Sequence, residues 1–179
     1  MTDALTGLPT HRDGLGDAII ARGPACCLVD VDALIWVNAE SGHAEGDRVL
    51  TVLARFLERA VADRGTTVFR VGGDEFLLLE PSLEAPAARE LASNVVSGVR
   101  ALAIPYRRRD RPSRTTVEVN AVVLRATREF AEGAFTELGM TPAGRDWVGE
   151  QLFREKTLLG HEAGIVLDLF DATDCPWAG

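Results

Sequence analysis

Two carboxylates stand directly behind a pair of glycines near the middle of the chain, where Asp74 and Glu75 follow Gly72 and Gly73. The flanking runs TTVFRV and EFLLLE favour strands, so the glycine pair predicts a β-hairpin. Glycine at the turn allows positive φ and leaves room for a ligand against the backbone. Neighbouring strand residues face opposite sides, so only one of the two acids can face a given site. This arrangement indicates a site for a hard cation and phosphate, because such cations take oxygen ligands and are bridged by substrate phosphates.

A second pair of acids closes an apolar run upstream. Residues 25–32, ACCLVDVD, are typical of a fully buried strand, and they end in Asp30 and Asp32. Ligand sites in sheets with such strands lie at the carboxyl ends, so both acids are candidate ligands. The three cysteines lack the spacing of metal ligands, and we interpret the adjacent Cys26 and Cys27 as small core residues.

Several further elements could position these acids. Apolar spacing and breaker residues predict helices over 11–21, 43–63, 81–103 and 145–159, and strands over 115–124 and 164–170. The basic segment 106–114 contains a proline and is interpreted as a surface hairpin loop rather than a phosphate patch. Residues 125–144 give no clear pattern. The order of elements predicts an α/β sandwich, in which helices pack on a mainly antiparallel central sheet.

Length and charge narrow the class of protein. The 179 residues suffice for one domain, with 46% hydrophobic and 26% charged residues. A net charge of -8 argues against non-specific binding to nucleic acid or to a membrane surface, so neither is expected as a partner. An acidic protein that binds nucleotides needs a metal to offset the phosphates. Neither a signal peptide nor an apolar run of spanning length is evident, so we expect a cytoplasmic location.

Three motifs give the chain a family resemblance. Residues 72–76 read GGDEF, residues 3–12 resemble a DxLTGLPNR opening motif with Thr10 in the Asn place, and residues 30–47 follow the pattern D-x-D-x-F-K-x-x-N-D-x-x-G-H-x-x-G-D. The matching positions of the third motif are Asp30, Asp32, Asn38, Gly42, His43, Gly46 and Asp47. On these motifs the chain resembles the GGDEF-domain family, the diguanylate cyclases, as a divergent member. The resemblance treats 1–170 as a single domain and 171–179 as a C-terminal tail, and it implies the palm-like fold of nucleotidyl cyclases.

The resemblance also implies a reaction. Members of the family condense two GTP molecules into cyclic di-GMP with release of pyrophosphate, using Mg²⁺ (or Mn²⁺). Two domains face each other so that each 3′-OH attacks the other's α-phosphate, which implies a homodimer at least during catalysis. By position, the implied catalytic residues are Asp74, Glu75 and Lys156. The implied substrate contacts are Asn38, Asp47, Leu34, Gly72 and Gly73, with Asn38 and Asp47 reading guanine. The implied metal ligands are Asp30, the carbonyl of Val31, and Asp74.

Departures from the family pattern leave two interpretations open. Ile35 stands in place of a phosphate-binding lysine, Gly160 in place of an arginine, and Asn120-Ala121-Val122 in place of a Ser-x-Gly element. Asp63 and Thr66 replace the product-binding Arg-x-x-Asp pair, so strong feedback by cyclic di-GMP is not expected. The first interpretation is an active diguanylate cyclase. The alternative is a weakly or non-catalytic GGDEF domain that binds GTP or a partner and acts as a regulatory module.

Overall fold

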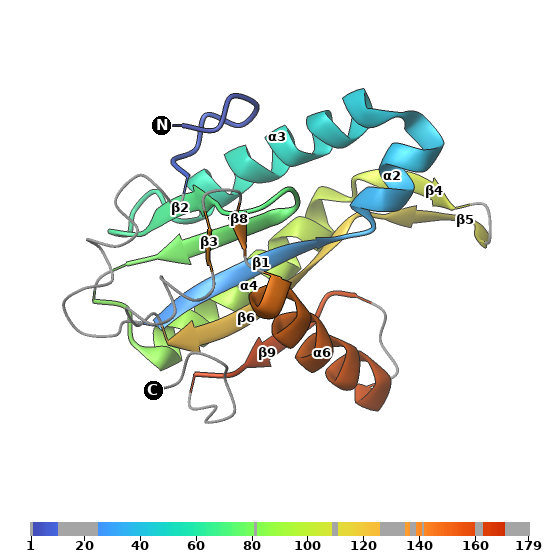
Figure 1. Ribbon diagram of the computed structural model, residues 1–179. Helices are drawn as coiled ribbons and strands as arrows, with labels where there is room; N and C mark the ends of the chain where they lie inside the picture. Colours follow the sequence, from blue (N-terminus) through green and yellow to red (C-terminus); the bar gives the residue numbers. More distant parts are fainter. Residues whose placement is uncertain are drawn as a thin grey trace.

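Five strands form the central sheet of the computed structural model, which describes residues 2–10, 25–80, 82–108, 111–125, 135–136, 139–140, 142–159 and 163–170 (Figure 1). The strands lie in the order β2-β3-β1-β6-β9. Their bounds are β1 Ala25–Asp32, β2 Thr67–Arg70, β3 Glu75–Leu79, β6 Glu118–Arg125 and β9 Val166–Asp168. Every neighbouring pair is antiparallel except β6 and β9, which are parallel. The predicted mainly antiparallel sheet is therefore confirmed.

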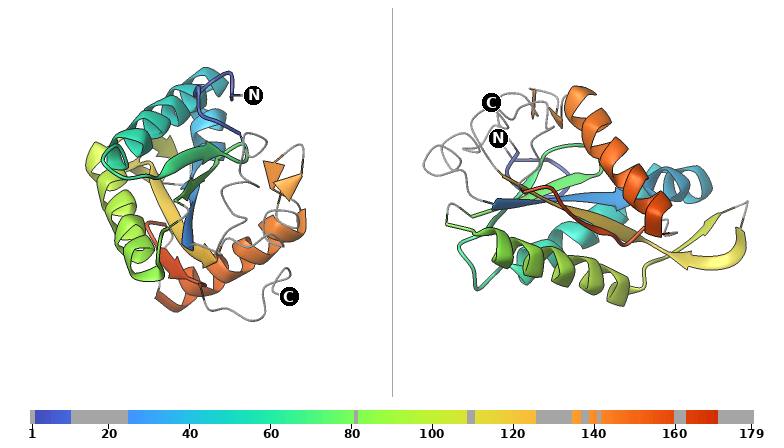
Figure 2. Two further views of the ribbon diagram at one scale, coloured as in Figure 1. Left: turned by 90° about the vertical axis from the view of Figure 1, so that its left-hand side faces the viewer. Right: turned by 90° about the horizontal axis from the view of Figure 1, so that it is seen from below.

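Helices cover both faces of this sheet. The helices are α2 Leu34–Ser41, α3 His43–Ala60, α4 Ala85–Leu102 and α6 Pro142–Leu159. α3 and α4 lie on one face and α6 lies on the other (Figure 2). Two small antiparallel pairs stand apart from the sheet, β4 Pro105–Arg108 with β5 Arg111–Thr116, and β7 Phe135–Thr136 with β8 Gly139–Met140. Among the described helices, none combines the length and apolarity needed to cross a membrane.

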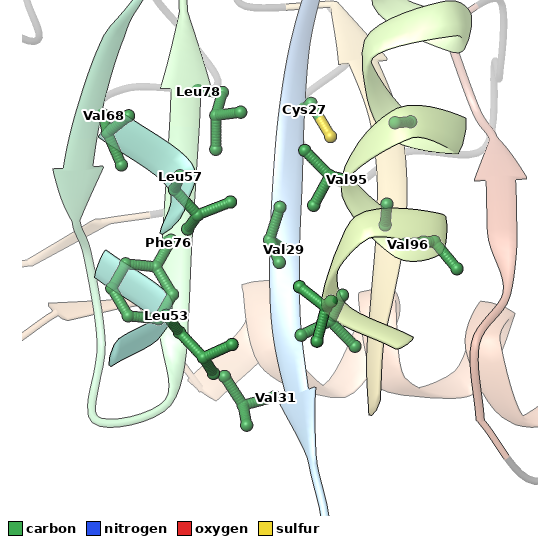
Figure 3. Packing of buried hydrophobic residues seen from close by; sticks show 14 of the residues in the cluster. Cys27, Val29, Val31, Leu53, Leu57, Val68, Phe76, Leu78, Val95 and Val96 are labelled. Carbon is green, nitrogen blue, oxygen red and sulfur yellow. The ribbon is translucent and has the colours of Figure 1, made fainter. Parts of the chain in front are cut away.

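Alternation along β1 divides the core into two clusters. Cys27, Val29 and Val31 pack with residues of α3 and α4 (Figure 3), whereas Cys26 and Leu28 belong to a second cluster beneath α6. The predicted burial of both cysteines is confirmed, and burial raises the pKa of the Cys27 thiol to about 12. Because side chains alternate along a strand, Asp30 and Asp32 fall on the same face as Cys26 and Leu28. The acids at the end of β1 therefore face the side of the sheet that α6 covers.

Most differences from the predicted elements lie at their ends. α3 ends at Ala60, before the predicted limit at 63, and α4 begins at Ala85 rather than at 81. The strand predicted over 115–124 is divided at Val117, whose N–H donates to the carbonyl of Ile104 at 2.8 Å. This bond ends the β4–β5 hairpin, after which the chain enters the central sheet as β6. The segment 106–114, predicted as a surface hairpin loop, thus belongs largely to the strands β4 and β5. The sequence did not indicate these strands, because arginines stand where apolar residues would alternate with polar ones. The predicted helix over 11–21 and the tail 171–179 lie outside the described residues.

Candidate functional site

A row of three polar side chains crosses the sheet at the carboxyl end of β1. Glu75 of β3 and Asn120 of β6 are the direct partners of Asp30 on either side. Directly opposite residues have Cβ atoms about 4.5–5.5 Å apart, so Glu75 and Asp30 are cross-strand neighbours. Glu75 is 7% exposed and Asn120 is fully buried, while Asp30 is half-buried. Asn120 donates from Nδ2 to Oδ1 of Asp30 at 3.4 Å.

The turn between β2 and β3 is joined to the end of β1. The N–H of Val31 donates to the carbonyl of Asp74 at 3.0 Å. Within the turn, the N–H groups of Val71 and Gly72 both donate to the carbonyl of Glu75, at 3.1 and 3.3 Å. The predicted hairpin is confirmed, and the backbone bond places Asp74 beside Val31. The end of β1 and the hairpin turn, which were predicted separately to carry ligands, therefore lie next to each other.

The two glycines of the turn meet only part of what the sequence predicted for them. Neither Gly72 nor Gly73 adopts the positive φ that the sequence suggested. At Gly72 the side chain of Glu75 occupies the space of a Cβ, with Cδ only 2.9 Å from that position. A Cβ on Gly73 would meet no heavy atom within 4 Å. The room that was predicted for a ligand against the backbone therefore exists at Gly73 and not at Gly72.

Arg70 fixes the outer side of the turn. Its guanidinium donates to the carbonyls of Gly72 at 3.2 Å and Gly73 at 2.6 Å, and to Oδ1 of Asp3 at 3.0 Å. The same oxygen of Asp3 accepts from the N–H and the hydroxyl of Thr6, at 2.8 and 2.6 Å. Burial alone would raise the pKa of Asp3, but the hydrogen bonds from Thr6 and the charge of Arg70 together lower it. Arg70 was not among the predicted site residues, although an arginine two residues before the glycine pair, at the end of an apolar strand, is a recognisable signal.

The two predicted guanine-reading residues lie on consecutive helices. Asn38 is in α2 and Asp47 is in the first turns of α3, with Gly42 between the helices at φ 85. The side chain of Asn38 packs against Gly46, where a Cβ would lie 3.0 Å from Cγ of Asn38. Oδ1 of Asn38 is buried and has no hydrogen-bond partner among the described residues, whereas Asp47 is exposed. The role of both residues in reading guanine therefore stays a prediction.

The other predicted residues have mixed surroundings. Leu34 is 9% exposed and belongs to the main core cluster, so its contact with substrate stays a prediction. Ile35 beside it is 74% exposed. Lys156 lies in α6, but its side chain is outside the described part of the chain, as is Gly160.

The candidate ligands at the end of β1 and in the adjoining turn are oxygen donors, the kind that a magnesium ion prefers. The candidate ligands are the carboxylates of Asp30 and Asp74 and the carbonyl of Val31, and the bond between Val31 and Asp74 brings their segments together. Within the described residues, no group of three or more His, Cys, Asp and Glu side chains is arranged to hold a metal. Mg²⁺ does not need one, because it binds through one or two carboxylates plus substrate phosphates and keeps several waters.

Comparison with known proteins shows the family to which the chain belongs. Residues 1–135 match the family described as diguanylate cyclase, GGDEF domain, and the chain belongs to this GGDEF-domain family. It is 38% identical to the diguanylate cyclase DgcM of Escherichia coli K12 over 101 residues, and 33% identical to the diguanylate cyclase VdcA of Vibrio cholerae over 110 residues. These alignments cover 52% and 59% of this chain, but only 24% and 32% of the relatives. The chain therefore spans about a quarter to a third of the curated relatives that it matches.

Solved structures confirm the fold. The GGDEF domain of DgcB from Caulobacter crescentus in complex with c-di-GMP aligns with a TM-score of 0.63 at 20% identity, over 93% of this chain and 94% of that one. The diguanylate cyclase SiaD from Pseudomonas aeruginosa, solved with its activator SiaC, also aligns with a TM-score of 0.63, at 24% identity, over 93% of this chain and 61% of that one. Both the predicted family and the predicted fold class are thus established.

Proposed function

We propose that this chain is a catalytic GGDEF domain that condenses two molecules of GTP into cyclic di-GMP and pyrophosphate. The observation that carries the proposal is the meeting of the β1 end with the hairpin turn, where Asp30 lies opposite Glu75 and Val31 is bonded to Asp74. Carboxylates directly opposite each other in a sheet repel, which costs the fold stability. A divalent cation bound at this end of the sheet would offset that repulsion.

Asp30, Asp74 and the carbonyl of Val31 are the residues that would hold Mg²⁺ or Mn²⁺. When bound, such an ion offsets the charge of the triphosphate and the charge that develops during phosphoryl transfer. The open space at Gly73 lets the triphosphate approach the backbone of the turn. Since GTP is the substrate, we assign the chain to the cytoplasm.

Base choice rests on Asn38 and Asp47. Guanine presents two adjacent donors on its pairing edge, the ring N–H and the amino group, whereas adenine presents an acceptor beside its amino group. The amide oxygen of Asn38 and the carboxylate of Asp47 are both acceptors. Two acceptors suit guanine and leave the adenine ring nitrogen without a donor.

The reaction itself proceeds between two copies of the domain. The 3′-oxygen of one GTP forms a bond to the α-phosphorus of the other, the bond from that phosphorus to the α–β bridging oxygen breaks, and pyrophosphate leaves. Glu75 is our candidate acceptor for the proton of the 3′-OH. The same step in the opposite direction closes the ring, so a homodimer is required during turnover.

A regulatory role is the second candidate. The observation that favours it is Ile35, which is 74% exposed where the family has a lysine and so offers no charge to the triphosphate. A lost hydrogen bond to a charged group costs about 1.5–3 kcal/mol. A domain weakened in this way could bind GTP and act through a partner with little turnover.

Incubation of the protein with GTP and Mg²⁺, followed by chromatography of the products, tests the proposal. We expect cyclic di-GMP from the native chain, and neither product nor Mg²⁺-dependent GTP binding from Asp30→Ala or Asp74→Ala. Asp63→Ala is the matched control, because this exposed acid lies away from the turn. If calorimetry gave the same GTP affinity with Mg²⁺ for native protein, Asp30→Ala and Asp74→Ala, the site assignment would be wrong. If the native chain bound GTP but made no product at high protein concentration, the regulatory role would replace the catalytic one.

A further inference from the structure

Asn120 connects the candidate metal ligand Asp30 to the segment that leads into β9. Its side chain is fully buried. Nδ2 donates to Oδ1 of Asp30 at 3.4 Å, and Oδ1 of Asn120 accepts from the N–H of Ile165, also at 3.4 Å. One amide group therefore bridges two parts of the chain on the face that α6 covers.

The orientation of this amide is determined by its partners. A backbone N–H can only donate, so the oxygen of Asn120 must face Ile165. The NH₂ group is then directed at Asp30, and it can only donate. Ile165 is itself held in place, because its carbonyl accepts from the N–H of Ala121 at 2.8 Å. Asp30 thus has a fixed donor on the β6 side, and Glu75 is its partner in register on the β3 side.

We propose that Asn120 is a positioning residue for Asp30, which it orients for a divalent cation. A donor that is locked by Ile165 holds the carboxylate of Asp30 by one oxygen and so fixes its orientation. This inference rests on the proposed function, since it assumes that Asp30 is a metal ligand. It also explains the departure from the Ser-x-Gly element. Asn120 stands in place of the serine, and its amide can donate to Asp30 and accept from Ile165 at the same time.

Binding of Mn²⁺, followed by electron paramagnetic resonance with a non-hydrolysable GTP analogue present, tests this role without turnover. Asn120→Leu keeps the volume of the side chain and removes both hydrogen bonds. We expect its half-saturating Mn²⁺ concentration to rise about tenfold, at the low end of the effect of a lost partner of a metal ligand, because the bond to Asp30 is long. The rate of cyclic di-GMP formation at limiting Mn²⁺ should fall by a similar factor and recover at high Mn²⁺.

Val122→Ala is the matched control. Val122 is fully buried two residues further along β6 on the same face, so its truncation weakens the core without touching Asp30. We expect Val122→Ala to lower the free energy of unfolding and leave the Mn²⁺ affinity unchanged. Asn120→Ser is the second variant in case Asn120→Leu does not fold. Its hydroxyl is too short to bridge both partners, so its Mn²⁺ affinity should also fall.

The outcomes separate this inference from the proposed function. Native affinity for Mn²⁺ in whichever Asn120 variant folds would overturn the positioning role alone. An equal loss of affinity in Val122→Ala would overturn it as well, because the effect would then be general to the core. If the native chain bound no Mn²⁺ in the presence of the GTP analogue, the proposed function and this inference would both fail.

Discussion

At the scale of single residues, Gly72 and Glu75 form one unit. The side chain of Glu75 lies where a side chain on Gly72 would be, and Glu75 is only 7% exposed to solvent. Gly73 next to it borders open space. Two glycines that look equivalent in the sequence therefore have separate tasks, one for packing and one for access.

Replacing each glycine by alanine should separate these tasks. Gly72→Ala forces Glu75 aside, so we expect a loss of about 1–3 kcal/mol in the free energy of unfolding, as for overpacked cores. Gly73→Ala should change stability by less than about 0.5 kcal/mol, since its methyl group meets nothing. GTP binding should fall in Gly73→Ala, because the methyl group occupies the space proposed for the triphosphate. Urea unfolding and calorimetry measure the two effects, and the opposite order of stabilities would contradict this account.

Asp47 provides a test of base choice. Asp47 is exposed near the start of α3 and directly follows Gly46, against which Asn38 packs. We expect the native protein to bind GTP more tightly than ATP, and Asp47→Ala to lose about tenfold of that preference, as for one good hydrogen bond to a charged group. Glu58→Ala, at an exposed acid on the same helix, is the control. Equal affinity of the native protein for ATP and GTP would refute the assignment of both residues.

At the scale of elements, the hairpin turn is held between the end of β1 and the N-terminal segment. Val31 bonds to Asp74 on one side, and Arg70 joins Gly72 and Gly73 to Asp3 on the other. The site therefore depends on three segments that are distant in sequence, and the first of them contains no candidate ligand.

The lowered pKa of Asp3 predicts how this anchor responds to acid. A group whose pKa is lower in the folded protein contributes stability above its unfolded pKa, here near the ordinary value of 3.8, and that stability is lost as the pH falls through the lower folded value. Asp3→Asn should be less stable than the native protein by a constant amount at neutral pH. The difference should shrink as the pH drops below about 4 and vanish in strong acid. Urea unfolding across this range is the measurement, with Asp63→Asn as an exposed control. A difference that grew on acidification would contradict the role of Arg70.

The sequence predicted the elements of the site better than their contacts. β1 and the β2–β3 hairpin were predictable, because a continuous apolar run and a glycine pair are local signals. The row of Glu75, Asp30 and Asn120 depends on strand pairing, which no local pattern specifies. The contact between Glu75 and Gly72 depends on how one side chain packs. In the β4–β5 hairpin the arginines replaced the apolar residues by which strands are recognised.

At the scale of the whole molecule, charge is unevenly distributed. The chain has 19 basic and 27 acidic residues, yet the β4–β5 segment from 105 to 116 contains five arginines and one aspartate. This hairpin extends from the end of the sheet where α2 begins, and its arginines Arg108 and Arg111 are paired in register (Figure 1). The candidate site at the end of β1 contains acidic residues by contrast, which suits the cation that we propose for it.

Adding one positive charge at the site should therefore raise turnover. Ile35→Lys restores a charge-assisted hydrogen bond worth about 1.5–3 kcal/mol, which corresponds to a gain of about tenfold to a hundredfold in rate if the bond forms only in the transition state. Lys156→Ala should nearly eliminate turnover. Ala44→Lys adds the same charge at an exposed position of α3 and should have little effect. Initial rates of cyclic di-GMP formation at saturating GTP decide the matter. If Ile35→Lys gave no gain over Ala44→Lys, the exposed Ile35 would not mark the missing phosphate contact.

The polar row has a consequence for how the protein folds. Asn120 and Asp30 are 90 residues apart in the chain, and Glu75 comes from a strand between them. The β2–β3 hairpin closes a short loop, whereas the pairing of β1 with β6 must close a long one and bears a larger entropic cost. The hairpin can therefore form early, but the row cannot exist before the long-range pairing is complete. In a refolding experiment, recovery of Mn²⁺ binding should trail the recovery of strand structure and coincide with the last, slowest phase of burial of the core.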